Sequence, residues 1–245
     1  MFNWIHRLGS AAVCYRLASR LIPWMAILTT GLIIYGVIGA LYLSPPDYQQ
    51  GEGFRIIFVH VPSAMLSLGI YFYISVCAII FLVWKIKVAD ALIAVSLPLG
   101  ALFTLITLVT GSLWGKPMWG TYWIWDARLT SELILLFIYG GIIALRNALP
   151  TPKTAAKAGA FLILIGLVDL PVIHYSVSWW NTLHQGSTLL KFSRPSIAPA
   201  MLQPLLVMIG AFFSYSMLYV CIALRGELLK REKDTHWVQN INSLD

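Results

Sequence analysis

The sequence predicts an all-α integral membrane protein with six transmembrane helices. Of its 245 residues, 59% are hydrophobic and only 11% are charged, whereas soluble proteins average about 25% charged residues. Six apolar runs follow one another along the chain, separated by shorter polar segments. Each run reaches roughly the 17 residues that a helix rising 1.5 Å per residue needs to cross a bilayer. We therefore expect one six-helix membrane domain over residues 1–245.

The elements follow from the alternation of apolar and polar segments. Residues 1–20 mix three arginines with apolar side chains, which is typical of a helix lying at a membrane surface. The predicted spans are 21–43, 56–84, 91–113, 129–145, 158–175 and 202–224. The segments between them are 44–55, 85–90, 114–130, 146–157 and 176–200, and a charged, solvated tail follows at 225–245.

The distribution of cations predicts the orientation of these spans. Six spans place both termini on one side, together with the turns 85–90 and 146–157. Twelve of the seventeen Lys and Arg residues then lie on that side and five on the other. Because Lys and Arg are enriched in cytoplasmic segments, we expect both termini in the cytoplasm. The segments 44–55, 114–130 and 176–200 would face outward, which in a bacterial inner membrane means the periplasm.

Residues 114–130 form the most unusual segment, predicted as an outward-facing loop between the third and fourth helices. Four of the ten tryptophans fall within it, together with a tyrosine, two cations and an acid: Trp114, Trp119, Trp123, Trp125, Tyr122, Lys116, Arg128 and Asp126. Indoles often anchor a membrane protein at headgroup level, but such a belt accounts for one or two tryptophans per helix end. Flat rings beside opposite charges indicate a binding surface for a flat, amphipathic ligand.

Two histidines are predicted on the same side of the membrane as the tryptophans. His60 lies near the outer end of the second span, and His184 lies in the polar segment 176–200. Imidazole is an axial ligand of haem iron, and arginine clamps carboxylates such as the haem propionates. Arg128 and Arg55 are candidates for that role, and Lys116 adds a point charge.

His174 competes with His184 as a ligand. On a continuous helix the two would lie roughly 15 Å apart, too far for both to bind one iron. We favour His184, because it lies in the polar segment, and we read His174 as a hydrogen-bonding residue at the end of a span.

Few other side chains suggest catalysis or metal binding. The three cysteines are isolated, and the chain contains no Cys-x-x-Cys-His, His-Glu-x-x-His or Gly-x-Ser-x-Gly motif. Glu132 lies one helical turn after Arg128, so we expect an i, i+4 ion pair. Asp169 falls inside the fifth span near Pro171. An ionisable group at that depth is costly and suggests a function, although it could instead serve the backbone that the proline frees.

The run 114–132 resembles the tryptophan-rich WWD signature of haem-handling proteins. Together with the segment 174–188, the six spans and the chain length, it resembles the haem exporter protein C family of cytochrome c maturation, over essentially the whole chain to about residue 225. Larger members of the WWD group, which attach haem to apocytochrome, have more spans. Tyr122 stands where the signature has tryptophan, and Asp169 stands where we expect an amide.

This resemblance implies a haem-binding and delivery protein rather than an enzyme, although it could assist covalent attachment of haem to a chaperone. Haem b would be held transiently and without a covalent bond, with His60 and His184 as axial ligands and the tryptophan segment as a platform. The implied partners are the haem chaperone CcmE, the small protein CcmD and the ABC-type pair CcmA and CcmB, and no nucleic acid. Two other classes stay open: a secondary transporter of a small solute, which needs a polar site at the membrane midplane, and a redox subunit with haem fixed between helices.

Overall fold

The computed structural model describes residues 9–180, 182, 184 and 197–241, and within them the protein is helical, without strands. The α-helices are α2 (Ala11–Ile38), α3 (Ile57–Trp84), α4 (Lys87–Trp119), α5 (Ala127–Ala148), α6 (Pro152–Gly166), α7 (Asp169–Trp179), α8 (Pro199–Arg231) and α9 (His236–Gln239). A π-helical turn, Gly39–Leu43, ends α2, and a 3-10 turn, Glu52–Ile56, leads into α3.

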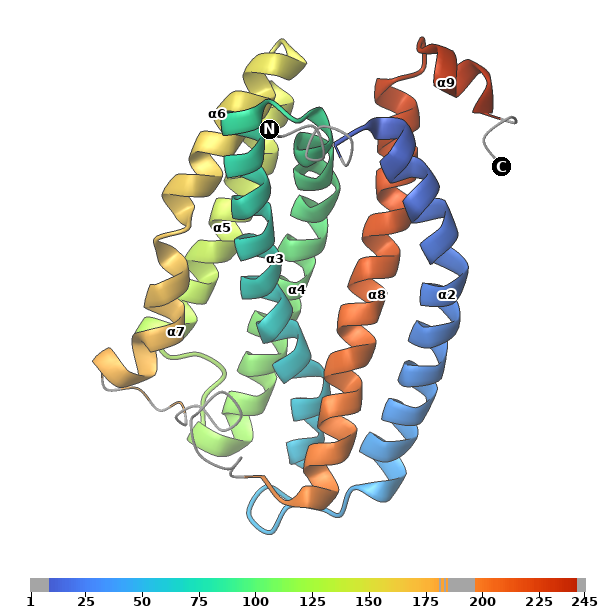
Figure 1. Cartoon of the computed structure of the whole chain (residues 1–245). Helices are drawn as coiled ribbons and strands as arrows, with labels where there is room; N and C mark the ends of the chain where they lie inside the picture. The colour runs from blue at the N-terminus through green and yellow to red at the C-terminus, as the bar shows by residue number, and fades with distance from the viewer. Residues whose placement is uncertain (1–8, 181, 183, 185–196, 242–245) are drawn as a thin grey trace.

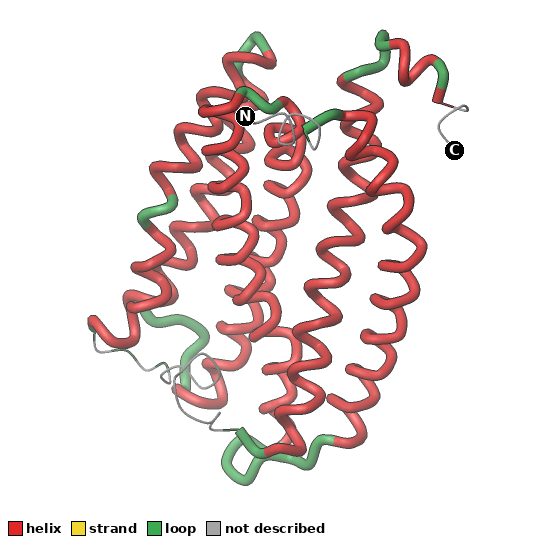
Figure 2. Tube along the Cα trace, in the orientation of Figure 1, coloured by secondary structure: helices red, strands yellow, loops and turns green. Residues whose placement is uncertain are grey.

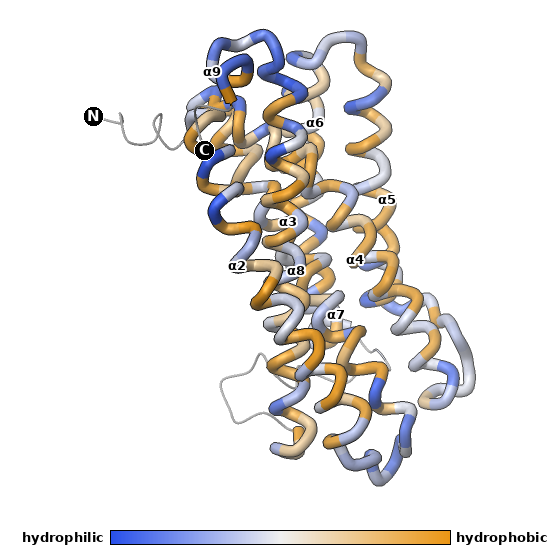
Figure 3. Tube along the Cα trace, turned by 90° about the vertical axis from the view of Figure 1, so that its right-hand side faces the viewer, coloured by the Kyte–Doolittle hydropathy of each residue, from blue (hydrophilic) through white to orange (hydrophobic). Residues whose placement is uncertain are grey.

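Six segments of the described chain are long and apolar enough to cross a membrane. They are Ala11–Leu43, Glu52–Trp84, Lys87–Trp119, Ala127–Ala148, Pro152–Trp179 and Pro199–Arg231. The predicted fold class and number of spans are therefore confirmed. The helices run along one common direction as a bundle (Figures 1 and 2). Hydrophobic residues dominate the middle of the bundle, and hydrophilic residues gather toward its two ends (Figure 3).

The centre of the bundle is the packing of α3 against α4. Helices α5, α6 and α7 lie on one side of this pair, and α8 with α2 lies on the other (Figure 1). Two buried tyrosines join the layers: Tyr139 donates to the Ser67 carbonyl over 3.0 Å, and its ring meets that of Tyr71 edge-on at 5.1 Å. Gly100 makes room for Tyr139, because an added Cβ would lie 2.3 Å from the phenolic oxygen. These contacts fix the position of α5 against the central pair.

The fifth span is not one helix but two, α6 and α7, with a break after Gly166. Pro171 has no N–H to bond the Leu167 carbonyl, which accepts a longer bond of 3.3 Å from the Leu170 amide instead. Gly166 itself lies against α3, where an added Cβ would be 2.1 Å from the Tyr71 phenolic oxygen. The hydropathy of this span predicts its length but not its interruption.

The two ends of the bundle gather different segments. One end holds the connection from α2 to α3, the tryptophan segment and the end of α7, and we call it the aromatic end (lower end in Figure 1). The other end, which we call the charged end, holds the turns after α3 and α5, the start of α2 and the end of α8. The described parts of the three predicted outward segments thus share one end. The assignment of that end to the periplasm stays a prediction.

Two predictions for the charged end need correction. Within the expected surface helix over residues 1–20, residues 11–20 belong to α2, which continues without interruption into the first span, and residues 1–8 lie outside the described residues. The tail 225–245 is not simply solvated, since α8 continues to Arg231 and Trp237 packs 5.7 Å from the Tyr15 ring. Arg225 lies 5.0 Å over the same tyrosine.

Asp90 ties the charged end together. Its side chain is 7% exposed and accepts from Arg146 at the end of α5 and from Arg231 at the end of α8, each over 2.7 Å. Arg231 also pairs with Glu227, one turn earlier on α8. The carboxylate therefore joins the start of α4 to the ends of two helices from opposite sides of the bundle.

We expect Asp90→Asn to lower the free energy of unfolding. Loss of a buried partner leaves uncompensated cations, and because both arginines retain some contact with solvent we expect a cost of about 2–3 kcal/mol. Thermal unfolding in detergent measures the change. The matched control is Glu227→Gln, which removes an exposed i, i+4 pair worth below about 1 kcal/mol. Equal losses from both variants would contradict the role of Asp90.

Candidate functional site

A small cavity lies between the helices at the aromatic end. Its volume is about 30 Å³, and its lining comes from regularly spaced positions on three helices and from one residue beyond α7. The lining residues are His60, Ala64 and Leu68 on α3, Thr107, Leu108 and Gly111 on α4, Arg128, Leu129 and Glu132 on α5, and His184. Spacings of three and four place each set on one helix face. The structure therefore brings both predicted histidines and Arg128 to the same place.

The hydrogen bonds of His60 determine its tautomer. Its Nδ1 lies 2.9 Å from the Thr110 hydroxyl oxygen, and that hydroxyl donates its own hydrogen to the Ile106 carbonyl over 2.6 Å. Because a hydroxyl has a single hydrogen, His60 must donate from Nδ1. Its Nε2 is then the basic nitrogen with a free lone pair. Gly111 leaves space beside the ring, since an added Cβ would lie 3.2 Å from His60 Cε1.

His184 is held in the same way by a carboxylate. Its Nδ1 donates to Asp126 Oδ2 over 2.8 Å, and the other carboxylate oxygen of Asp126 accepts from the Leu129 amide at the start of α5. Asp126 is therefore both the N-cap of α5 and the anchor of His184. Burial lowers the pKa of His184 below its ordinary value, and the Asp126 contact acts in the opposite direction. The imidazole is neutral near pH 7 and presents Nε2.

The tryptophan segment is a loop over only part of the predicted range 114–130. Helix α4 continues to Trp119, and Gly120 ends it with a positive φ of 77° and a 3.0 Å bond from its amide to the Lys116 carbonyl. Helix α5 starts again at Ala127. Pro117 lies in the last turn of α4 without ending it, so the loop is shorter than the predicted range.

The two tryptophans on α4 each contact one of the histidines. Trp114 meets His60 edge-on with ring centres 5.7 Å apart, and its indole N–H donates to Gln50 over 2.7 Å. Trp119 meets His184 edge-on at 4.7 Å. Gly115 lies beneath Trp119, where an added Cβ would be 2.9 Å from the indole ring. The last turns of α4 thus position an aromatic wall beside both imidazoles.

The remaining aromatic residues form the rim. Trp123 and Trp125 meet edge-on at 5.4 Å, with Trp125 77% exposed, and Lys116 lies 5.2 Å over the exposed Tyr122 ring. Among the described residues, the buried Trp123 indole nitrogen has no hydrogen-bond partner. Trp123 and Trp125 therefore do not stack on each other, and the role of the tryptophan segment as a haem platform stays a prediction.

The two charged residues that line the cavity differ in their hydrogen bonds. Arg128 and Glu132 both line the cavity, but Glu132 accepts from the Ser67 hydroxyl over 2.8 Å. The expected Arg128–Glu132 ion pair is not among those of the described residues. Glu132 is thus a cavity residue that sequence reasoning assigned to a structural pair.

Arg55, a predicted propionate ligand, does not line the cavity. Its guanidinium pairs with Glu52 and donates to the carbonyls of Ala40 and Ser44, where it caps the end of the first span. Three of the five N–H donors of the guanidinium are used in this connection, and a role of Arg55 at a propionate stays a prediction. His174 also lies elsewhere: it is exposed on α7 and packs edge-on against Tyr175 at 4.7 Å.

The side chains that line the cavity suit a haem, but the cavity is too small to hold one. Two neutral imidazoles with free Nε2 atoms match the axial ligands of a bis-histidine haem, and Arg128 beside them offers the donors that a carboxylate needs. A volume of about 30 Å³ has room for about one water molecule. A porphyrin can reach both imidazoles only if His184 and His60 move apart.

Comparison with known proteins identifies close relatives along the full length. The sequence profile of the family described as Heme exporter protein C matches residues 4–239. The Escherichia coli K12 protein of that description is 48% identical over 241 residues, which cover 98% of this chain and 97% of the relative. The Haemophilus influenzae protein of the same description is 46% identical over 239 residues, with coverage of 98% and 97%. A ccmC-like mitochondrial protein of Marchantia polymorpha, named for cytochrome c biosynthesis, is 44% identical over 190 residues, covering 78% of this chain and 80% of the relative.

We expect acidification to lower the free energy of unfolding through the buried His184, and Asp126→Asn to lower the pKa of His184 further. The ordinary histidine pKa is about 6.5. Because the folded pKa is lower, the contribution of His184 to stability is complete above that value and is lost as the pH falls. Removal of the carboxylate takes away the group that favours the imidazolium.

Histidine resonances of the protein in lipid nanodiscs, followed by NMR across the pH range, measure the pKa directly. Glu52→Gln removes the same charge from the aromatic end without touching His184, so it should leave the titration unchanged. A rise of the pKa in Asp126→Asn would contradict the proposed electrostatics.

Proposed function

Because this chain belongs to the haem exporter protein C family, we propose that it binds haem at the aromatic end and delivers it to the haem chaperone CcmE during c-type cytochrome maturation. The names of the relatives support a role in haem handling, and the name of the Marchantia relative refers to cytochrome c biosynthesis. In this proposal the protein lies in a bacterial inner membrane with its aromatic end toward the periplasm.

One observation carries the proposal: two imidazoles from distant parts of the chain line one cavity, and each uses Nδ1 for a protein hydrogen bond. Thr110 holds His60 and Asp126 holds His184. Such contacts fix the orientation of a ligating imidazole and increase its basicity. Both Nε2 atoms are therefore free to bind the iron of a haem, whose porphyrin would supply the other four ligands.

The two histidines have different surroundings, which suggests how haem enters. His60 belongs to the first turn of α3 and bonds a threonine on α4. His184 lies outside the helices, and Asp126 and Trp119 hold it through one hydrogen bond and one ring contact. We infer that His60 is the fixed ligand and that His184 shifts to admit the cargo.

The rest of the site binds the edges of the cargo and leaves part of it accessible. Trp114 and Trp119 border the imidazoles, Arg128 suits a propionate, and the unpaired indole N–H of Trp123 offers one more donor. Trp125 and Tyr122 are exposed at the rim. A ligand held at the end of a bundle can pass to a soluble chaperone, whereas one buried between helices could not.

The same reasoning bears on the other partners and on the other function classes. CcmD and the ABC-type pair CcmA and CcmB stay proposed partners, since energy for transfer must come from another protein. The haem would be haem b, bound without a covalent bond. No observation favours the solute transporter or the redox subunit, because the candidate ligands gather at the end of the bundle rather than at its centre.

We expect His60→Ala and His184→Ala each to abolish the bis-histidine haem spectrum and reduce the haem content of the purified protein. Each variant removes one axial ligand, and added imidazole should partly restore the spectrum by occupying the vacated position. His174→Ala is the matched control, because His174 is exposed and does not line the cavity. If His174→Ala alone abolished ligation, the assignment would be wrong.

We expect Trp119→Ala or Trp123→Ala to reduce haem loading of CcmE by roughly tenfold to a hundredfold. The estimate assumes that each ring contributes about 1–3 kcal/mol, as for bases stacked on aromatic side chains. Co-expression with the chaperone, followed by haem staining of CcmE, measures the loading. Trp24→Ala is the control, since Trp24 is 70% exposed on α2, far from the site. Normal loading by the Trp119/Trp123 double variant would show that these rings only anchor the protein in the membrane.

A further inference from the structure

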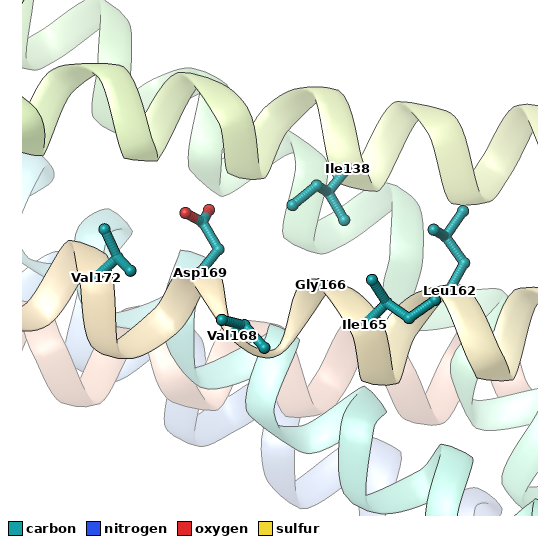
Figure 4. A pocket seen from close by; sticks show the side chains of 7 residues that line it. All are labelled: Ile138, Leu162, Ile165, Gly166, Val168, Asp169 and Val172. Atoms are coloured by element: carbon teal, nitrogen blue, oxygen red, sulfur yellow. The ribbon is translucent and has the colours of Figure 1, made fainter.

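A second hollow lies on the outer face of the bundle, where α5 meets the break between α6 and α7 (Figure 4). Its volume is about 290 Å³. The lining is apolar except for one carboxylate: Ile138, Leu162, Ile165, Gly166, Val168, Asp169 and Val172. Ile165 and Val168 at its rim are 69% and 71% exposed. Since these residues belong to membrane-spanning segments, the hollow opens toward lipid.

Asp169 directs its carboxyl group into this hollow, toward α5 (Figure 4). Its Oδ2 is buried and has no hydrogen-bond partner among the described residues. The nearby Tyr71 hydroxyl is not available, because it donates to the Ile163 carbonyl over 3.1 Å. Nor does Asp169 Oδ2 serve the backbone that Pro171 frees, since it makes no hydrogen bond to any described residue, either as donor or as acceptor. The described helices therefore leave this oxygen unsatisfied.

An acid without a hydrogen-bond partner is energetically costly at the depth of Asp169 in the membrane. The residue lies ten positions before Trp179 at the end of the span, which is roughly 15 Å along the helix axis and below the headgroup region of a bilayer. Lipid tails offer no donor there, and acids at such depth pair with other polar groups. A donor must therefore come from a molecule that reaches the hydrocarbon layer.

We propose that this hollow is the docking site of a membrane-spanning helix from a partner protein, which places a side-chain donor on Asp169. Only a helix satisfies its own backbone while crossing lipid beside this face. Ile165 and Val168 at the rim offer such a helix an exposed apolar surface beside the acid. The hollow accommodates one long side chain, and a lysine, arginine or amide fits both the carboxylate and the apolar walls.

Photo-crosslinking in cell membranes tests the site. The probe p-benzoylphenylalanine, placed at Val168 on the rim, should capture another protein through a peptide from an apolar span that contains a lysine, arginine, asparagine or glutamine. The control position is Phe213, which is 45% exposed on α8 and should not capture that peptide. Mass spectrometry of the adduct identifies the peptide.

The dependence on Asp169 separates specific docking from chance contact. Asp169→Leu should reduce the adduct by about threefold to twentyfold, the range for one interhelical hydrogen bond in a membrane, and Asp169→Glu should retain most of it. Thermal unfolding checks that the leucine variant is folded. If it is not, Ile165→Trp, which fills the hollow from its rim, must give the same loss. Capture of lipid alone, capture of a second copy of this chain, or an equal yield from Asp169→Leu would overturn the proposal.

Discussion

The candidate site depends on the two hydrogen bonds of Asp126. One carboxylate oxygen starts α5 by accepting from the Leu129 amide, and the other holds His184. A single side chain thus joins the tryptophan segment, the helix that carries Arg128 and Glu132, and the segment that follows α7. Because the side chain is only 8% exposed, these bonds are protected from competition by water. The relative position of the two histidines follows from this connection.

Much of the fold could be predicted because hydropathy is a local property. Each span has enough apolar residues to identify it without knowledge of its neighbours, and six such runs define the class. The ends of the helices were harder, since a proline or a glycine has different effects in different contexts. Pro117 stays within α4, Gly120 ends it, and Pro171 interrupts the fifth span. Those differences depend on which neighbouring groups can form hydrogen bonds with the backbone atoms that a proline or glycine leaves unpaired.

The site could be predicted only as a set of residue types. His60 and His184 share a side of the membrane by topology, and the structure brings them to one cavity. The residues that orient them are less visible in sequence: Thr110 is 50 positions from His60 and lies on another helix. Arg55 shows the converse limit. Its charge and location suit a propionate, but sequence alone does not reveal that two of its nitrogens donate to carbonyls at the end of the first span.

The length of α4 has a consequence for how the aromatic wall is built. With 33 residues, the helix measures roughly 50 Å, whereas the hydrocarbon core of a bilayer is about 30 Å thick. The helix is therefore longer than the hydrocarbon layer requires, and the height and direction of Trp114 and Trp119 in its last turns are set by the number of residues before them. One residue inserted before Trp114 would turn both indoles by about 100° about the helix axis. The aromatic wall therefore tolerates substitutions along α4 better than a change in its length.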